Sequence, residues 1–144
     1  MKVAEILKQK GQDVISVRSE ESIETFAHRL RMARIGAMVV VDDAGGLTGI
    51  ISERDVVHGL AEHGPRCLEL NVGDLMTTRV VTCAPEDGIA RIARLMTENR
   101  IRHLPVVENG RLAGVVSVGD VVKNRLEEMS LEANVLRDMA MAGG

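Results

Sequence analysis

Aromatic side chains are almost absent from this sequence of 144 residues, which contains one Phe and neither Tyr nor Trp. Proteins that bind single-stranded nucleic acid stack the bases on aromatic rings, so this scarcity argues against such a partner. The formal net charge of −3 also disfavours a surface that follows the phosphate backbone of a nucleic acid. We therefore expect no nucleic-acid partner.

Long apolar runs are missing as well. The longest run, residues 37–41, is far shorter than the roughly 20 residues that a membrane-spanning helix needs. The first residues, MKVAEILKQKGQD, lack the apolar region of a signal peptide. We therefore expect a cytoplasmic protein that does not interact with a membrane.

Potential metal ligands and reactive thiols are few. Cys67 and Cys83 are the two cysteines of the chain, and they form neither a CxxC motif nor another ligand spacing. Two free thiols are the expectation for a reducing cytoplasm. His58 and His63 lie five residues apart without an acidic or Cys partner in a ligand pattern, so we expect no metal site.

Most of the sequence is present in two copies. The segment GIISERDVV at 49–57 returns as GVVSVGDVV at 114–122, with the same Gly, Ser, Asp and Val-Val. Internal repeats of this kind indicate that one structural unit occurs twice. Three further pairs of segments match: VAEIL (3–7) with VGDLM (72–76), VISVRSEESI (14–23) with VVTCAPEDGI (80–89), and IGAMVVVDDAGGLTGIIS (35–52) with IRHLPVVENGRLAGVVS (101–117).

Each copy predicts a strand, an amphipathic helix, a β-hairpin and a second helix. Apolar residues at steps of three and four indicate the helices, and β-branched runs joined by DDAGG or ENG indicate the hairpins. We expect strands at 14–17 and 80–83, helices beginning near 23 and 89, and hairpin strands at 38–41, 47–51, 104–107 and 112–116.

These elements predict an α/β (α+β) fold of two βαββα repeats related by pseudo-two-fold symmetry. A unit of about 60 residues is too small to bury the faces of its own sheet, so two units should pack together around a shared cleft. We place the first repeat at 1–63, a linker at 64–71, the second repeat at 72–128 and a C-terminal helix extension and tail at 129–144.

The repeated Ser-x-x-Asp step is the first candidate site. Ser52 with Asp55, and Ser117 with Asp120, each fall where a strand meets a helix. Such residues can cap the free N–H groups of the helix. A carboxylate and a hydroxyl at a helix start can equally hold the hydroxyls of a ribose, with helix N–H groups near a phosphate. The residues alone leave both interpretations open.

Nearby side chains add candidates for phosphate binding. Arg102 and His103 precede a buried strand of the second copy and could contact phosphate, or could simply be surface charges at a strand edge. The first copy has Gly36 and Ala37 at these positions, and Arg54 could substitute there or stay solvated. Hydroxyls at Ser16 and Thr82 could meet a ligand or remain half-buried in their strands.

The last helix carries an apolar stripe that continues beyond the second repeat. A stripe of this length predicts an interface between two copies of the chain. Its residues recur at steps of three and four: Val122, Leu126, Met129, Ala133, Leu136 and Ala140.

In its doubled unit, its GIISERD and GVVSVGD corners and its RIRHLPVV strand, the sequence resembles a tandem CBS-domain pair, also called a Bateman module. The resemblance covers nearly the whole chain. Within the family, the sequence is similar to the stand-alone bacterial members. It implies a disc-like homodimer that binds AMP, ADP, ATP, NAD or S-adenosylmethionine between its repeats, with AMP as the first expectation.

The resemblance also implies roles for individual residues. Asp120 and Asp55 would hold ribose hydroxyls, with Ser117 and Ser52 nearby. Arg102 and His103 would contact phosphate in the site of Asp120. In the site of Asp120, the base would lie in a slot lined by Val81, Thr82, Ala84, Ile101, Leu104 and Pro105. In the site of Asp55, the slot for the base would be lined by Val17, Ile35 and Met38.

These features together predict a non-catalytic sensor of adenine nucleotide that regulates an unidentified protein partner. The alternative is a small enzyme that processes nucleotides or uses Cys83 in redox chemistry. The sequence offers no Gly-rich phosphate loop and no acid–base pair at a usual spacing to support that alternative.

Overall fold

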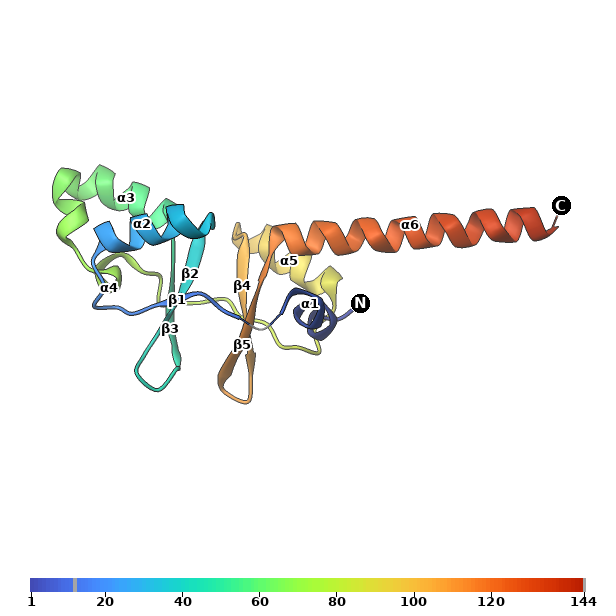
Figure 1. The fold of residues 1–144 in the computed structure, drawn as a ribbon, viewed down its shortest axis with the longest axis horizontal. Helices are drawn as coiled ribbons and strands as arrows, with labels where there is room; N and C mark the ends of the chain where they lie inside the picture. Colours follow the sequence, from blue (N-terminus) through green and yellow to red (C-terminus); the bar gives the residue numbers. More distant parts are fainter. Residues whose placement is uncertain (12, 144) are drawn as a thin grey trace.

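The computed structural model describes residues 1–11 and 13–143, and the predicted mixed α/β architecture with two similar units is confirmed (Figure 1). The first unit contains β1 to α3, and the second contains α5 to the start of α6. The elements are α1 Val3–Lys10, β1 Ser16–Val17, α2 Ile23–Ala33, β2 Ala37–Val41, β3 Leu47–Ser52, α3 Glu53–His63, the 3-10 helix η1 Gly64–Glu69, α4 Val72–Leu75, α5 Ile89–Asn99, β4 His103–Glu108, β5 Arg111–Ser117 and α6 Val118–Gly143.

Each unit is built around a β-hairpin with the same register. In the first unit β1 lies parallel to β2, which pairs antiparallel with β3, and in the second unit β4 pairs antiparallel with β5. The second hairpin closes through Asn109 and Gly110, whose φ angles of 52° and 75° suit a two-residue turn. The registers set Ala37 opposite Ser52 and His103 opposite Ser117.

The strand expected at 80–83 is not formed, and this prediction was wrong. Cys83 makes one isolated parallel bridge, donating its N–H to the Pro105 carbonyl at 3.0 Å and accepting from the Val107 N–H at 2.8 Å. The ladder cannot extend by a further step because Pro105 has no N–H to donate. The residue of the first unit that is equivalent to Pro105 is Val39, which has a backbone N–H and pairs with Ser16 in β1.

The leading helix of each repeat packs on the other unit. Val3, Ile6 and Leu7 of α1 are buried in the core of the second unit, against residues such as Ile92 and Leu104. Figure 1 shows α1 beside β5 and α5, far from the rest of its own repeat. Two backbone bonds fix its start, from the Val3 N–H to the Asp87 carbonyl and from the Ala4 N–H to the Pro85 carbonyl, both at 2.9 Å.

The exchange is reciprocal. Val72 of α4 is buried in the core of the first unit, with Phe26 and Val40. Its N–H donates to the Glu21 carbonyl at 2.8 Å. The linker expected at 64–71 also packs on this unit, since residues 64–69 form η1 and Cys67 is fully buried. The two units are therefore tied together by exchanged segments as well as by contact.

The C-terminal helix α6 extends well beyond the second unit (Figure 1). Val121 and Asn124 near its start are buried. The later residues carry large exposed apolar side chains: Leu126, Met129, Leu131, Val135, Leu136, Met139 and Met141. In the described part of the chain, no helix is both long and apolar enough to cross a membrane.

The exchanged packing of α1 predicts which unit a mutation in this helix destabilises. Ile6→Ala should lower the free energy of unfolding by about 2–5 kcal/mol, because it leaves a cavity in the core of the second unit. Urea denaturation measures the loss, and Gln9→Ala, on the exposed side of α1, is the control. Amide hydrogen exchange should accelerate first in α5 and β5. Faster exchange confined to α2 and β2 would contradict the exchanged arrangement.

Candidate functional site

The two Ser-x-x-Asp steps form the same capping structure. The Asp55 carboxylate accepts from the Ser52 N–H at 2.8 Å and from the Ser52 hydroxyl at 3.2 Å, while the Asp55 N–H donates to the Ser52 Oγ at 3.4 Å. Asp120 and Ser117 repeat the pattern with distances of 2.9, 3.0 and 3.2 Å. The capping interpretation of these residues is therefore confirmed.

The cap uses the same single carboxylate oxygen of each aspartate. All of these bonds to Asp55 and Asp120 end on Oδ2. Among the described residues, neither Oδ1 accepts a hydrogen bond. Capping and ligand binding are consequently compatible uses of the same side chain.

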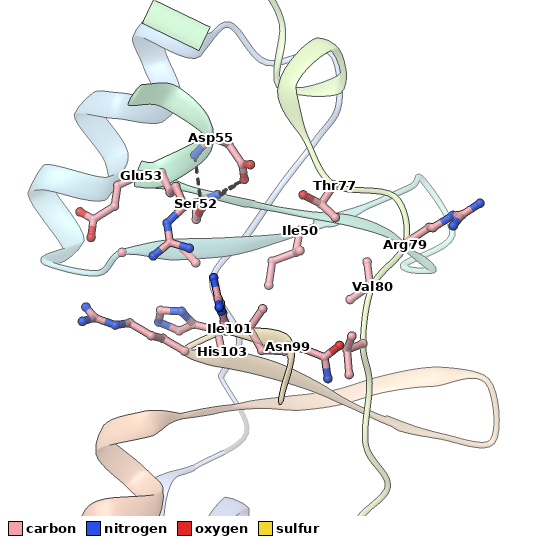
Figure 2. Close-up of a pocket in the computed structure, with 16 residues that line it drawn as sticks. Ile50, Ser52, Glu53, Asp55, Thr77, Arg79, Val80, Asn99, Ile101 and His103 are labelled. Carbon is pink, nitrogen blue, oxygen red and sulfur yellow. Dashed lines mark hydrogen bonds between the residues drawn. The ribbon is translucent and has the colours of Figure 1, made fainter. Parts of the chain in front are cut away.

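The first corner opens onto a cavity of about 330 Å³, which we call the Asp55 pocket (Figure 2). Residues from both units face one another across it, with Ser52 and Asp55 on one side and Ile101 and His103 on the other. It is lined by Gly36, Ala37, Ile50, Ser52, Glu53, Arg54, Asp55, Thr77, Arg79, Val80, Val81, Asn99, Arg100, Ile101, Arg102 and His103.

The second corner borders a cavity of about 370 Å³, which we call the Ser117 pocket. It combines Ser117 of the second unit with segments of the first unit, in the reverse of the arrangement at the Asp55 pocket. Its lining is Lys10, Gly11, Asp13, Val14, Ile15, Arg34, Ile35, Gly36, Ala37, Met38, Val39, Ile50, His103, Gly114, Val115 and Ser117.

The structure groups the candidate residues differently from the sequence. Arg102 was assigned to the corner of Asp120, but it lines the Asp55 pocket together with Val81 and Ile101. Conversely, Ile35 and Met38 line the Ser117 pocket. The reason is that each cavity lies between the units, so a corner of one unit faces the segment before the hairpin of the other. Residues predicted for the site that line the Asp55 pocket are Gly36, Ala37, Ser52, Arg54, Asp55, Val81, Ile101, Arg102 and His103.

Several other candidates lie outside both cavities. Leu104 and Val17 are core residues with 0% and 1% exposure, and Pro105 is also buried. The remaining ones also line neither cavity: Ser16 belongs to β1, whereas Thr82 and Ala84 belong to the segment between α4 and α5. Asp120 does not line the Ser117 pocket directly, although its partners Ser117 and Lys10 do.

Basic residues of the pockets were missed by the sequence analysis. Arg34 and Arg100 end α2 and α5 in the same left-handed conformation, and each lines a different pocket. Extending the repeat alignment by one residue, from Ile35 and Ile101 back to an Arg in both copies, would have found them. No comparable signal marked Lys10, which reaches its pocket through the exchanged helix α1.

Lys10 neutralises the carboxylate at the second corner. Its Nζ donates to Asp120 Oδ2 at 2.7 Å and to the Val115 carbonyl at 2.8 Å. Burial acts to raise the pKa of Asp120, but the hydrogen bonds from Lys10 and Ser117, with the Lys10 charge, bring it below the usual 3.8. Asp120 is therefore ionised at neutral pH and already has a cationic partner.

His103 lies in the wall that the two pockets share, together with Gly36, Ala37 and Ile50. Its pKa is lowered from 6.5, first by burial and then by the charges of Lys10 and Arg102. The imidazole is consequently neutral at pH 7 and can both donate and accept a hydrogen bond.

A family model described as CBS domain matches residues 3–62 and 72–127 of the chain. A mitochondrial CBS domain-containing protein of Arabidopsis thaliana is 31% identical over 149 residues, spanning 98% of this chain and 72% of that protein. The CBS domain-containing protein YhcV of Bacillus subtilis is 29% identical over 117 residues, spanning 81% and 82%.

Solved structures agree with these matches. A CBS-domain containing protein from Agrobacterium tumefaciens has a TM-score of 0.84 at 43% identity, over 87% of this chain and 99% of its own. The CBS domain pair of protein MJ0100 has a TM-score of 0.78 at 26% identity, over 89% and 98%, and its structure is a complex with 5′-methylthioadenosine and S-adenosyl-L-methionine.

The lowered pKa of His103 predicts a pH dependence of stability. Between this pKa and 6.5 the unfolded chain binds a proton at His103 that the folded chain does not, so the free energy of unfolding should decrease as the pH falls below 6.5. His103→Gln should remove this part of the decrease, measured by urea denaturation between pH 7.5 and 5.5. His28→Gln, at an exposed position on α2, is the control. An unchanged slope in His103→Gln would contradict the expectation.

Proposed function

Since this chain belongs to the CBS-domain family, we propose that it is a non-catalytic regulatory module that binds an adenosine-containing ligand between its two repeats. The observation that carries the proposal is that a capped Ser-x-x-Asp corner adjoins each inter-unit cavity and leaves one aspartate oxygen without a hydrogen bond among the described residues. A carboxylate oxygen at a helix start can accept hydrogen bonds from the hydroxyls of a ribose.

AMP is the ligand that we propose first, and NAD, ATP, ADP and S-adenosylmethionine are the alternatives. Support for an adenosyl group comes from the MJ0100 pair, whose two ligands share adenosine. The apolar side chains of Val81 and Ile101 in one pocket, and of Ile35 and Met38 in the other, are suited to contact a base. The cavities of about 330 and 370 Å³ fall within the range of small-molecule sites.

A redox or thiol enzyme is less well supported. Burial, and then the charge of Asp87, raise the pKa of the Cys83 thiol from 9.0 to about 12. The thiolate is the reactive form of cysteine, so Cys83 is protonated and a poor nucleophile at neutral pH. The raised pKa of Cys83 therefore favours ligand binding over thiol chemistry as the function of the protein.

Ligand binding should stabilise the fold and depend on the two aspartates. AMP, ATP, NAD and S-adenosylmethionine are titrated while the melting temperature is followed; a ligand at 100 times its Kd adds about 2.7 kcal/mol of stability. Asp55→Ala should abolish the shift in melting temperature that arises from ligand in the Asp55 pocket. Asp120→Ala should abolish the shift that arises from ligand in the Ser117 pocket.

A matched control exists in the same chain. Asp74 and Asn71 form an equivalent capping box on α4 that lines neither pocket, so Asp74→Ala should cost a cap and leave ligand binding intact. Absence of a shift with every ligand would contradict the proposed function. Turnover of a nucleotide during the titration would favour the enzyme instead.

We propose further that the module is a homodimer joined through α6. Its stripe repeats at alternating steps of four and three from Val122 to Ala140, which is the spacing of a two-helix coiled coil. Leu126 and Leu136 within it are 60% and 67% exposed. Glu132 and Arg137 flank the stripe five residues apart, so in a parallel pair each would meet the opposite charge on the second copy.

The mass in solution tests this interface. The chain should behave as a dimer of twice 15.6 kDa in light scattering, and Leu136→Glu should shift it towards the monomer because the stripe cannot bury a charge. Leu131→Glu is the matched control, since Leu131 is 65% exposed on the opposite side of the same helix. A monomeric wild-type chain, or equal effects of the two substitutions, would contradict the dimer.

A further inference from the structure

Arginine is concentrated in one of the two pockets. Arg54, Arg79, Arg100 and Arg102 all line the Asp55 pocket, where Glu53 and Asp55 are the only carboxylates among the described lining residues. Arg54 comes from the first unit, and the others come from segments of the second. Figure 2 shows Arg79 at the rim with its guanidinium turned outward. The pocket is therefore a meeting point of positive charge from both units.

These guanidinium groups have no carboxylate partner within the described chain. The ion pairs within 4.0 Å that involve arginine use Arg18, Arg29, Arg91 and Arg125, none of which lines either pocket. All four arginines of the Asp55 pocket are exposed and can change rotamer to reach a ligand. Like charges gathered around one cavity repel one another, and a multiply charged anion would relieve this repulsion through charge-assisted hydrogen bonds.

The Ser117 pocket differs in charge although the fold makes it the equivalent cavity. Of its two cations, Lys10 is bound to Asp120 and to the Val115 carbonyl. Arg34 is then the one lining cation without such a partner in the described chain, and the same lining contains one carboxylate, that of Asp13. The position that Arg102 occupies in the second copy is Gly36 in the first.

We infer that the Asp55 pocket selects an adenosine ligand that carries two or more phosphate groups, whereas the Ser117 pocket takes an adenosine ligand of lower negative charge, such as the AMP that we propose first. This inference rests on the proposed function for the adenosine part of the ligand. Asp55 would receive the ribose, and Arg100 and Arg102 would contact the phosphate chain on the opposite wall. A fork-shaped guanidinium suits this task because it donates two parallel hydrogen bonds to phosphate oxygens.

Calorimetric titration of the full chain with ATP, ADP, AMP and adenosine tests the selectivity. We expect the Asp55 pocket to bind ATP and ADP at least about tenfold more tightly than AMP, and AMP more tightly than adenosine. The reason is that each charge-assisted contact to a phosphate is worth about a factor of ten or more in affinity. The preference should weaken as salt is added, since ions screen the exposed guanidinium groups.

Variants assign the selectivity to this pocket. Arg100→Gln and Arg102→Gln should each weaken ATP binding about tenfold or more, with little effect on adenosine. Arg34→Gln changes the repeat equivalent of Arg100, in the same backbone conformation, and should cost less ATP affinity. Arg94→Gln, at an exposed position of α5 outside both pockets, should leave ATP binding unchanged. Melting temperatures of the free variants verify that each is folded.

The outcomes separate this inference from the proposed function. Equal affinity for adenosine and ATP, or an equal loss in Arg34→Gln and Arg100→Gln, would overturn the charge selectivity while leaving adenosine binding in place. Inorganic triphosphate that binds as tightly as ATP, with the same dependence on Arg100, would support the anion site but overturn the adenosine ligand. Failure of all of these compounds to bind would overturn both.

Discussion

The exchange of leading helices between the two units is the constraint on which the rest of the molecule depends. Neither unit can bury its sheet alone, and each completes its core with a segment of the other repeat, α1 on the second unit and α4 on the first. The exchange holds the hairpins side by side, so that the corner after one hairpin faces the segment before the other (Figure 1). It also carries Lys10 to Asp120, a pair separated by 110 positions in the sequence.

In each Ser-x-x-Asp corner, the capping hydrogen bonds occupy only one of the two carboxylate oxygens. One oxygen of Asp55 or Asp120 accepts a hydrogen bond from the backbone N–H of the serine that caps the following helix, and this bond fixes the orientation of the side chain. The second oxygen is thereby held in place as well, and under the proposed function it would accept a hydrogen bond from the ligand without further ordering. A binding group that is already immobilised loses less entropy when the ligand arrives.

The repeats are similar in backbone and different in charge. Gly36 in one copy and Arg102 in the other occupy equivalent positions, as do Ala37 and His103. Because the cavities lie between the units, this difference does not give each unit its own kind of site. Instead it concentrates arginine at the Asp55 pocket and places the neutral His103 in the wall shared with the Ser117 pocket.

The amino-acid sequence by itself determined the local features: two copies of one unit, the helices set by apolar spacing, the Asn109–Gly110 turn and the capped corners, because neighbouring residues decide each of them. It indicated the candidate residues and placed Arg102 beside the Asp120 corner, where its carbonyl does accept from the Val118 N–H, but it did not reveal that Arg102 also lines the Asp55 pocket, since proximity was judged within one repeat. Pro105, whose missing N–H ends the ladder at Cys83, was visible in the sequence, but its effect depended on which strand lay beside it. Only the tertiary structure decided how the units exchange α1 and α4, and hence which charges share a cavity, because contacts between distant segments are selected by the burial of whole faces and not by local pattern.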